Sequence, residues 1–166
     1  MRAKTLLIVS LAVLSGACSG AGSGTNAPPP IDKKLLAGKW KSSSESLIIT
    51  GYEFGEEGTL KVTIRGMEKP IEGRYAWNGE RTLGLEYQTT AEVQKAYEAA
   101  AKTYKDDVTQ RIKDGKLLDR AGPSMLGAVP DKWPAAETVQ VAISEKPRLL
   151  ILTKEGEGSQ TYEKAD

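Results

Sequence analysis

Apolar and polar residues alternate along most of the chain after residue 31. The alternating apolar sets are Leu60, Val62 and Ile64; Ile71, Tyr75 and Trp77; Leu83, Leu85 and Tyr87; and Val139, Val141 and Ile143. A period of two is typical of antiparallel strands with one buried face. Leu149 to Leu152 is an unbroken apolar run, which indicates a strand covered on both faces.

Turn residues separate these segments at hairpin spacing. Glycines bracket the turns at 55–58 and 156–158, and Asn78-Gly79 predicts a type I′ hairpin with positive φ at both central residues. A meander of about seven strands with one apolar face hides that face by closing into a barrel or folding into a sandwich. The predicted fold class is therefore mainly β, with an antiparallel meander that forms a barrel or a sandwich; the barrel is what the resemblance described below implies.

One segment has helical periodicity instead. Thr89-Thr90-Ala91-Glu92 reads as a capping box. The apolar stripe that follows ends before Gly115 and consists of Val93, Tyr97, Ala100, Tyr104, Val108 and Ile112. Oppositely charged pairs four residues apart, Glu98 with Lys102 and Asp107 with Arg111, are expected on the solvated face. This pattern predicts one amphipathic helix inserted between strands.

The segment after the helix, 117–136, contains several prolines and is expected to be irregular. It carries more apolar surface than a solvated loop needs, which gives two interpretations. Core packing is the simpler one. The other is a binding surface for a ligand or partner, formed by Met125, Leu126, Val129 and Trp133.

The first residues have the pattern of a secretory signal peptide. A basic start with Arg2 and Lys4 precedes a short apolar run, and small residues then lead to Cys18, the only cysteine. The run is shorter than the ~20 residues that span a membrane. Residues 1–17 are therefore expected to be cleaved and 18–32 to form a flexible, proline-ended tether. Residues 33–166 form one domain, with the helix-plus-loop insertion at about 89–136.

Leu14-Ser15-Gly16-Ala17-Cys18 resembles the lipobox of bacterial lipoproteins. This resemblance implies that Cys18 is the lipid anchor and that the chain is held at a membrane of the cell envelope. Ser19 gives no signal for retention at the inner membrane, so the outer membrane is expected. Ser15 and Ala17 also suit ordinary signal peptidase, which leaves a periplasmic or secreted product open.

Composition removes several classes of function. Loss of Arg2 and Lys4 with the leader leaves 21 basic and 22 acidic residues, interspersed, so no nucleic-acid partner is expected. The chain has no histidine, which excludes a Ser-His-Asp triad and the usual zinc sites. The acidic pairs at 56–57, 106–107 and 155–157 fall in turns or on a polar face. No catalytic residues, metal site or cofactor are therefore predicted.

Gly38-Lys39-Trp40 supplies a Gly-x-Trp on the first predicted strand, and the segments 52–60 and 73–79 follow it. Together they resemble the small lipocalin-like β-barrel lipoproteins of bacterial envelopes, in particular the paralogous families of planctomycetes. The resemblance covers 35–87 and 138–164 and is interrupted by the helical insertion. It implies a barrel plugged at one end by Trp40, with a basic side chain over that ring, for which Arg74 and Arg148 are the candidates.

Two functional hypotheses follow. The first is a non-catalytic, lipid-anchored envelope protein whose domain binds a small apolar ligand or another envelope protein. The second is a purely structural or inhibitor-like domain with a filled core, and an uncharacterised enzyme ranks behind both. Whether the barrel is hollow or filled separates the first two.

Overall fold

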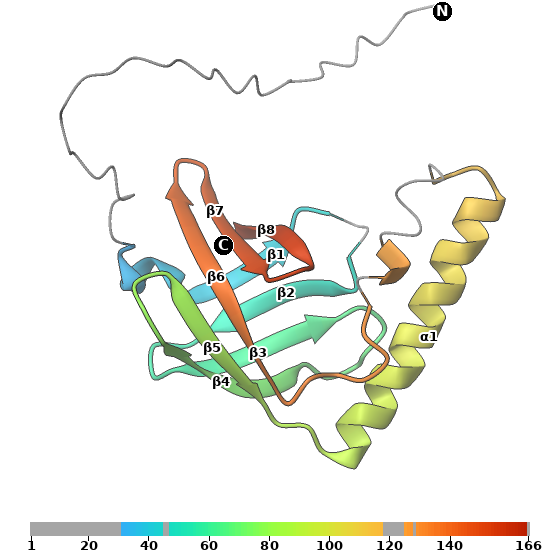
Figure 1. Cartoon of the computed structure of the whole chain (residues 1–166), viewed down its shortest axis with the longest axis horizontal. Helices are drawn as coiled ribbons and strands as arrows, with labels where there is room; N and C mark the ends of the chain where they lie inside the picture. Colours follow the sequence, from blue (N-terminus) through green and yellow to red (C-terminus); the bar gives the residue numbers. More distant parts are fainter. Residues whose placement is uncertain (1–30, 45–46, 118–124, 128, 166) are drawn as a thin grey trace, which may run out of the picture.

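The computed structural model describes residues 31–44, 47–117, 125–127 and 129–165. These residues form a closed antiparallel barrel of eight strands, in which each strand pairs with the next and β8 pairs with β1 (Figure 1). The strands are β1 (Gly38–Ser42), β2 (Ile49–Phe54), β3 (Thr59–Ile64), β4 (Ile71–Trp77), β5 (Thr82–Tyr87), β6 (Ala136–Glu145), β7 (Arg148–Lys154) and β8 (Gly158–Lys164). The predicted fold class is confirmed, with one strand more than the pattern suggested.

Every second residue along the strands points into the barrel, and these side chains fill its interior. On β3, for example, Leu60, Val62 and Ile64 are buried while their neighbours are exposed. On β7 only Leu150 and Leu152 are buried, and Leu149 and Ile151 are half-buried. The expectation of a strand covered on both faces is therefore wrong, because a barrel wall has only one interior side.

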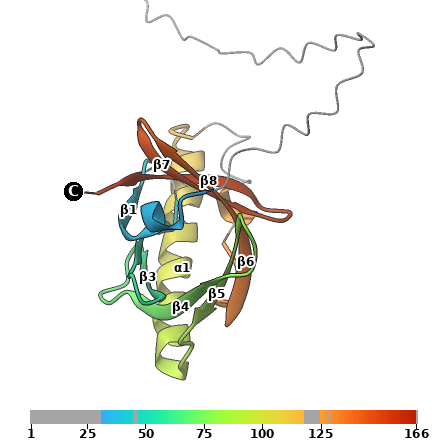
Figure 2. The same cartoon turned by 90° about the vertical axis from the view of Figure 1, so that its left-hand side faces the viewer.

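A short 3-10 helix, η1 (Lys33–Leu36), covers one end of the barrel (Figure 2). Leu36 is buried there, and the indole Nε1 of Trp40 donates a 2.7 Å hydrogen bond to its carbonyl oxygen. The ammonium group of Lys164 lies 4.7 Å from the centre of the Trp40 ring. The basic partner of Trp40 is thus Lys164, from the last strand, and neither Arg74 nor Arg148 takes that place.

The inserted helix, α1 (Ala91–Lys113), lies at the opposite end of the barrel from η1 (Figure 1). The middle of its predicted apolar stripe is buried, from Tyr97 to Val108, while Val93 and Ile112 at its ends are half-buried. Gly115 follows the helix with a φ of +66°. The N-cap is Thr90, whose hydroxyl accepts from Val93 N–H. Val93 at the third helical position cannot return a side-chain hydrogen bond, so the predicted capping box from Thr89 to Glu92 is wrong. Lys102 pairs with Asp106 at 2.8 Å and not with Glu98.

The β4–β5 connection is a loop of four residues, 78–81. No residue other than glycine has positive φ in the described chain, and Gly79 does not have it either, so the predicted type I′ turn is wrong. Asn78 N–H donates to Thr82 O at 2.9 Å to close this wider loop. A Cβ on Gly84 would lie 2.5 Å from the side-chain amide nitrogen of Asn78, so a larger residue at position 84 would require that side chain to move.

Candidate binding site at the mouth of the barrel

The end of the barrel beneath α1, here called the mouth, carries polar side chains on the inner face of three strands. Glu137 precedes buried Val139 by two residues on β6, and Lys154 follows buried Leu152 by two on β7. Gln160 occupies the same kind of position on β8, before buried Tyr162. The Glu137 side chain is only 11% exposed. Polar groups so far from water need partners, and the mouth supplies them.

Glu137 has two partners at the mouth. One carboxylate oxygen accepts a short hydrogen bond from the hydroxyl of Tyr87. The other lies 3.2 Å from the ammonium nitrogen of Lys154, which is also 2.8 Å from a carboxylate oxygen of Glu157. The group of two carboxylates and one ammonium has a formal charge of −1. The Tyr87 hydroxyl holds the Glu137 carboxylate in place.

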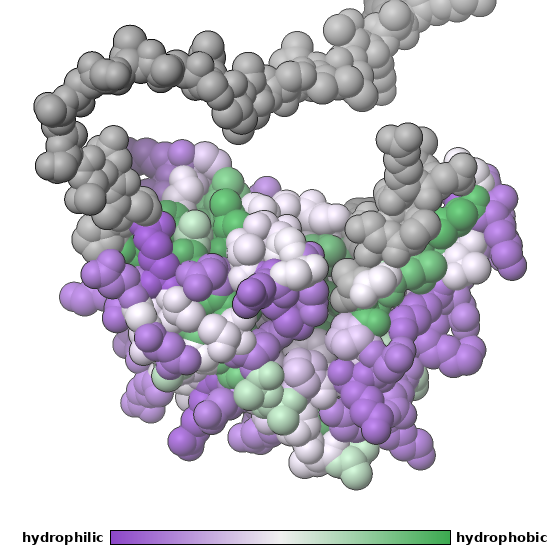
Figure 3. Space-filling model, in the orientation of Figure 1, coloured by the Kyte–Doolittle hydropathy of each residue, from purple (hydrophilic) through white to green (hydrophobic). Residues whose placement is uncertain are grey.

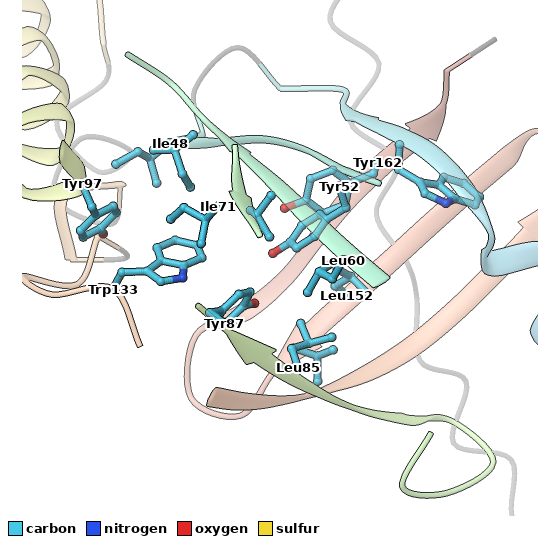
Figure 4. Packing of buried hydrophobic residues seen from close by; sticks show 14 of the residues in the cluster. Ile48, Tyr52, Leu60, Ile71, Leu85, Tyr87, Tyr97, Trp133, Leu152 and Tyr162 are labelled. Carbon is cyan, nitrogen blue, oxygen red and sulfur yellow. The ribbon is translucent and has the colours of Figure 1, made fainter. Parts of the chain in front are cut away.

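Three tyrosine hydroxyls gather beside this group. Figure 4 shows Tyr52, Tyr87 and Tyr162 pointing into the same part of the interior. Tyr162 donates to Gln160 Oε1 at 2.5 Å, and Tyr52 is hydrogen-bonded to Tyr162. The mouth is therefore a hydrogen-bonding region at one end of an otherwise apolar interior.

Burial controls the protonation of these groups. It raises the pKa of the Tyr87 hydroxyl far above its ordinary value, and the Glu137 carboxylate raises it further. Burial likewise raises the pKa values of Tyr52 and Tyr162. For Lys154, burial lowers the pKa, but the hydrogen bonds to Glu157 and Glu137 outweigh it and the net shift is upward. At neutral pH the tyrosines are consequently neutral hydrogen-bond donors rather than nucleophiles.

Trp133 closes the mouth, and α1 holds it there. Its ring packs edge-on against Tyr87 and Tyr97, with ring centres 5.1 and 5.2 Å apart. The Gln94 side chain donates to Trp133 O at 2.7 Å and accepts from Trp133 N–H at 3.2 Å. The hydroxyl of Tyr97 donates to Pro130 O at 2.9 Å. The segment 130–133 is thus attached to α1 by three hydrogen bonds between side chain and backbone.

The indole N–H of Trp133 is buried and has no hydrogen-bond partner among the described residues. Figure 4 shows its nitrogen facing the barrel interior. Trp133 also lines a cavity of about 50 Å³, together with Tyr52, Glu137 and Gln160. A cavity needs roughly 10–15 Å³ per water molecule, so this one has room for a few waters or one small polar group. A buried donor beside such a space calls for an acceptor.

The structure places the four predicted surface residues in two settings. Val129 and Trp133 are 5% and 4% exposed and belong to the core, so they offer little area to a partner. Met125 and Leu126 are half-buried and pack at its edge. Figure 3 shows a mainly hydrophilic face with hydrophobic residues beside the C-terminal half of α1. Cys18 lies outside the described residues.

The sequence analysis missed Glu137, Lys154 and Gln160, although a signal for them was present. Each lies two residues from a buried apolar residue of its strand and therefore points to the same side of the sheet. A pattern defined by apolar residues alone ends before these polar positions. The attachment of Trp133 to Gln94 has no such signal, because 39 residues separate the partners.

Comparisons of the chain with models of known families, with curated proteins and with solved structures found no match. The closed eight-strand barrel is compatible with a lipocalin-like fold. In the described part of the chain, no helix is long and apolar enough to cross a membrane. The same residues contain no cluster of three or more side chains suited to hold a metal ion.

Proposed function

We propose that the protein is a non-catalytic, lipid-anchored envelope protein whose barrel binds a small ligand at its mouth. The observation that carries this proposal is that Trp133, whose buried indole N–H is unpaired, lines a cavity together with Tyr52, Glu137 and Gln160. A domain that needed only a filled core would gain more from apolar side chains at these inward positions. A few polar groups fixed in position at one end of a mainly apolar interior are typical of a binding site.

The size of the cavity limits how a ligand enters. A cavity of 150 Å³ is known to admit benzene, and the one here is about a third of that volume. A ligand with an apolar body must therefore displace the Trp133 ring and take its place against Tyr87 and Tyr97. Its polar group would then meet the tyrosine hydroxyls and Glu137, so the proposed ligand is small, mainly apolar and carries one hydrogen-bonding group.

Native mass spectrometry of the protein extracted from envelopes in mild detergent tests this proposal. The folded protein is expected to carry an additional small mass that is lost on denaturation. Glu137→Gln should reduce the occupied fraction because the variant weakens the polar end of the site. The matched control is Glu86→Gln, whose side chain is exposed on the adjacent strand β5.

The filled barrel favours a second candidate, a structural or inhibitor-like domain that acts through another envelope protein. Side chains fill the interior up to the mouth, where the Tyr52 ring has Phe54 and Tyr162 beside it at ring-centre distances of 5.7 and 5.0 Å. Absence of any bound mass in wild-type protein, with Glu137→Gln as stable as wild type, would reject the ligand proposal and support this alternative.

The proposed anchor is tested separately. Mass spectrometry of the N-terminal peptide from the membrane fraction is expected to show an acylated Cys18, and Cys18→Ala should release the protein into the soluble fraction. Soluble wild-type protein with an unmodified Cys18 would refute lipidation and leave the ligand proposal untouched.

A further inference from the structure

A second site lies at the end of the barrel that η1 covers. A groove of about 180 Å³ opens between η1, the β6–β7 turn and the end of β8. Its apolar wall consists of Leu35, Trp40 and Ile143, and its basic side chains are Lys34, Arg148 and Lys164. Among the described residues, Glu145 is the one acidic residue that lines it. The groove thus combines a hydrophobic surface with an excess of positive charge.

The three basic groups lack carboxylate partners within ion-pair distance among the residues that the structure describes. Lys164 is held in place by Trp40 and by a short hydrogen bond to the carbonyl oxygen of Ala37. Burial lowers the pKa of Lys164, and the nearby charge of Arg148 lowers it further. An anion between these two residues would relieve that repulsion.

The groove also lies where the tether enters the domain, since η1 begins two residues after Ile31. Twelve residues, 19–30, separate Cys18 from this point. Fully extended, they span at most about 40 Å. If Cys18 is acylated, the barrel end that carries the groove stays close to the membrane surface, and this part of the argument rests on the proposed anchor.

We propose that this groove binds the anionic headgroup of a phospholipid in the membrane that holds the protein. The phosphate would lie between Arg148, Lys34 and Lys164, because a guanidinium group can bind a phosphate through two parallel hydrogen bonds. The glycerol and upper acyl carbons would contact Leu35 and Ile143. Net charge cannot explain such binding, since the chain without its leader has 21 basic and 22 acidic residues.

The test uses the exported and processed Cys18→Ala protein, which has no acyl group of its own. It is mixed with vesicles of phosphatidylcholine alone or of equal parts phosphatidylcholine and phosphatidylglycerol, and co-sedimentation is measured. Binding is expected only to the anionic vesicles. Arg148→Gln should weaken it about five-fold, the change that corresponds to about 1 kcal/mol per basic residue at an anionic surface.

Arg74→Gln is the matched control, because it removes the same charge from an exposed position on β4, away from the groove. This variant should bind as wild type does. Equal binding to both kinds of vesicle, or equal losses in the two arginine variants, would overturn the proposal. Displacement by inorganic phosphate at the concentration of lipid phosphate would also overturn it, in favour of a soluble anion. None of these results depends on whether Cys18 of the native protein is acylated.

Discussion

Trp40 has a structural role that a single substitution can measure. Its side chain is 2% exposed, its N–H is bonded to Leu36 O, and Lys164 lies over its ring. Trp40→Ala is expected to lower the free energy of unfolding by roughly 3–5 kcal/mol, the range for emptying a buried aromatic site. Urea titration followed by circular dichroism measures the change. A loss below ~1 kcal/mol would mean that the ring contributes little to closing this end.

The buried tyrosines couple stability to alkaline pH. Burial raises the pKa of Tyr97 from 10.0 to about 12. Between these values the unfolded chain loses a proton that the folded chain keeps, so the free energy of unfolding falls as the pH rises and is unaffected below that window. Urea titrations across this range should show a shallower decline in Tyr97→Phe than in wild type. Identical slopes in the two proteins would contradict the assignment.

At the scale of elements, α1 depends on how it begins. The hydroxyl of Thr90 accepts the N–H of Val93 at 3.2 Å, whereas Thr89 lies outside the helix. Thr90→Ala is therefore expected to cost about 1 kcal/mol of stability, as loss of an N-cap usually does. Thr89→Ala is the matched control and should be neutral. Equal effects of the two substitutions in thermal unfolding would place the cap elsewhere.

The insertion as a whole can be separated from the barrel. β5 and β6 pair directly up to the hydrogen bond from Tyr87 N–H to Ala135 O, at 2.8 Å. Replacing residues 88–134 by a short glycine-containing turn should preserve the eight-strand pairing and remove the helix. Circular dichroism is expected to show a β-rich protein that unfolds cooperatively, at a lower temperature because the mouth has lost the buried Trp133 and Tyr97.

The insertion experiment also bears on the proposed function. The shortened protein should no longer retain the ligand mass, since one wall of the site is gone. An unfolded product would show instead that the barrel cannot fold without the core contacts of α1 and the segment 129–134, and it would remove the reason to treat the insertion as a functional addition.

For the whole molecule, the sequence predicted an antiparallel meander because alternation is a local signal repeated from strand to strand. Alternation left a barrel and a sandwich open, and the resemblance carried by Gly38-Lys39-Trp40 implied the barrel. It also predicted the buried stripe of α1 and its end at Gly115. The partner of Trp40 could not be predicted, because it depends on how the last strand meets the first. Only part of the mouth could be predicted from the sequence. Glu137, Lys154 and Gln160 lie in the inward register of their strands, but their convergence with Trp133 follows only from closure of the sheet.

The pairing of β1 with β8 has a consequence for how the chain is made. Synthesis proceeds from the N-terminus, so β8, which completes the sheet by pairing with β1, leaves the ribosome after the other seven strands. Until then β1 and β7 remain open edges, which can pair with other chains. A nascent chain therefore cannot acquire its closed form early. If the leader directs export as proposed, this delay keeps the polypeptide unfolded for passage through the translocation machinery.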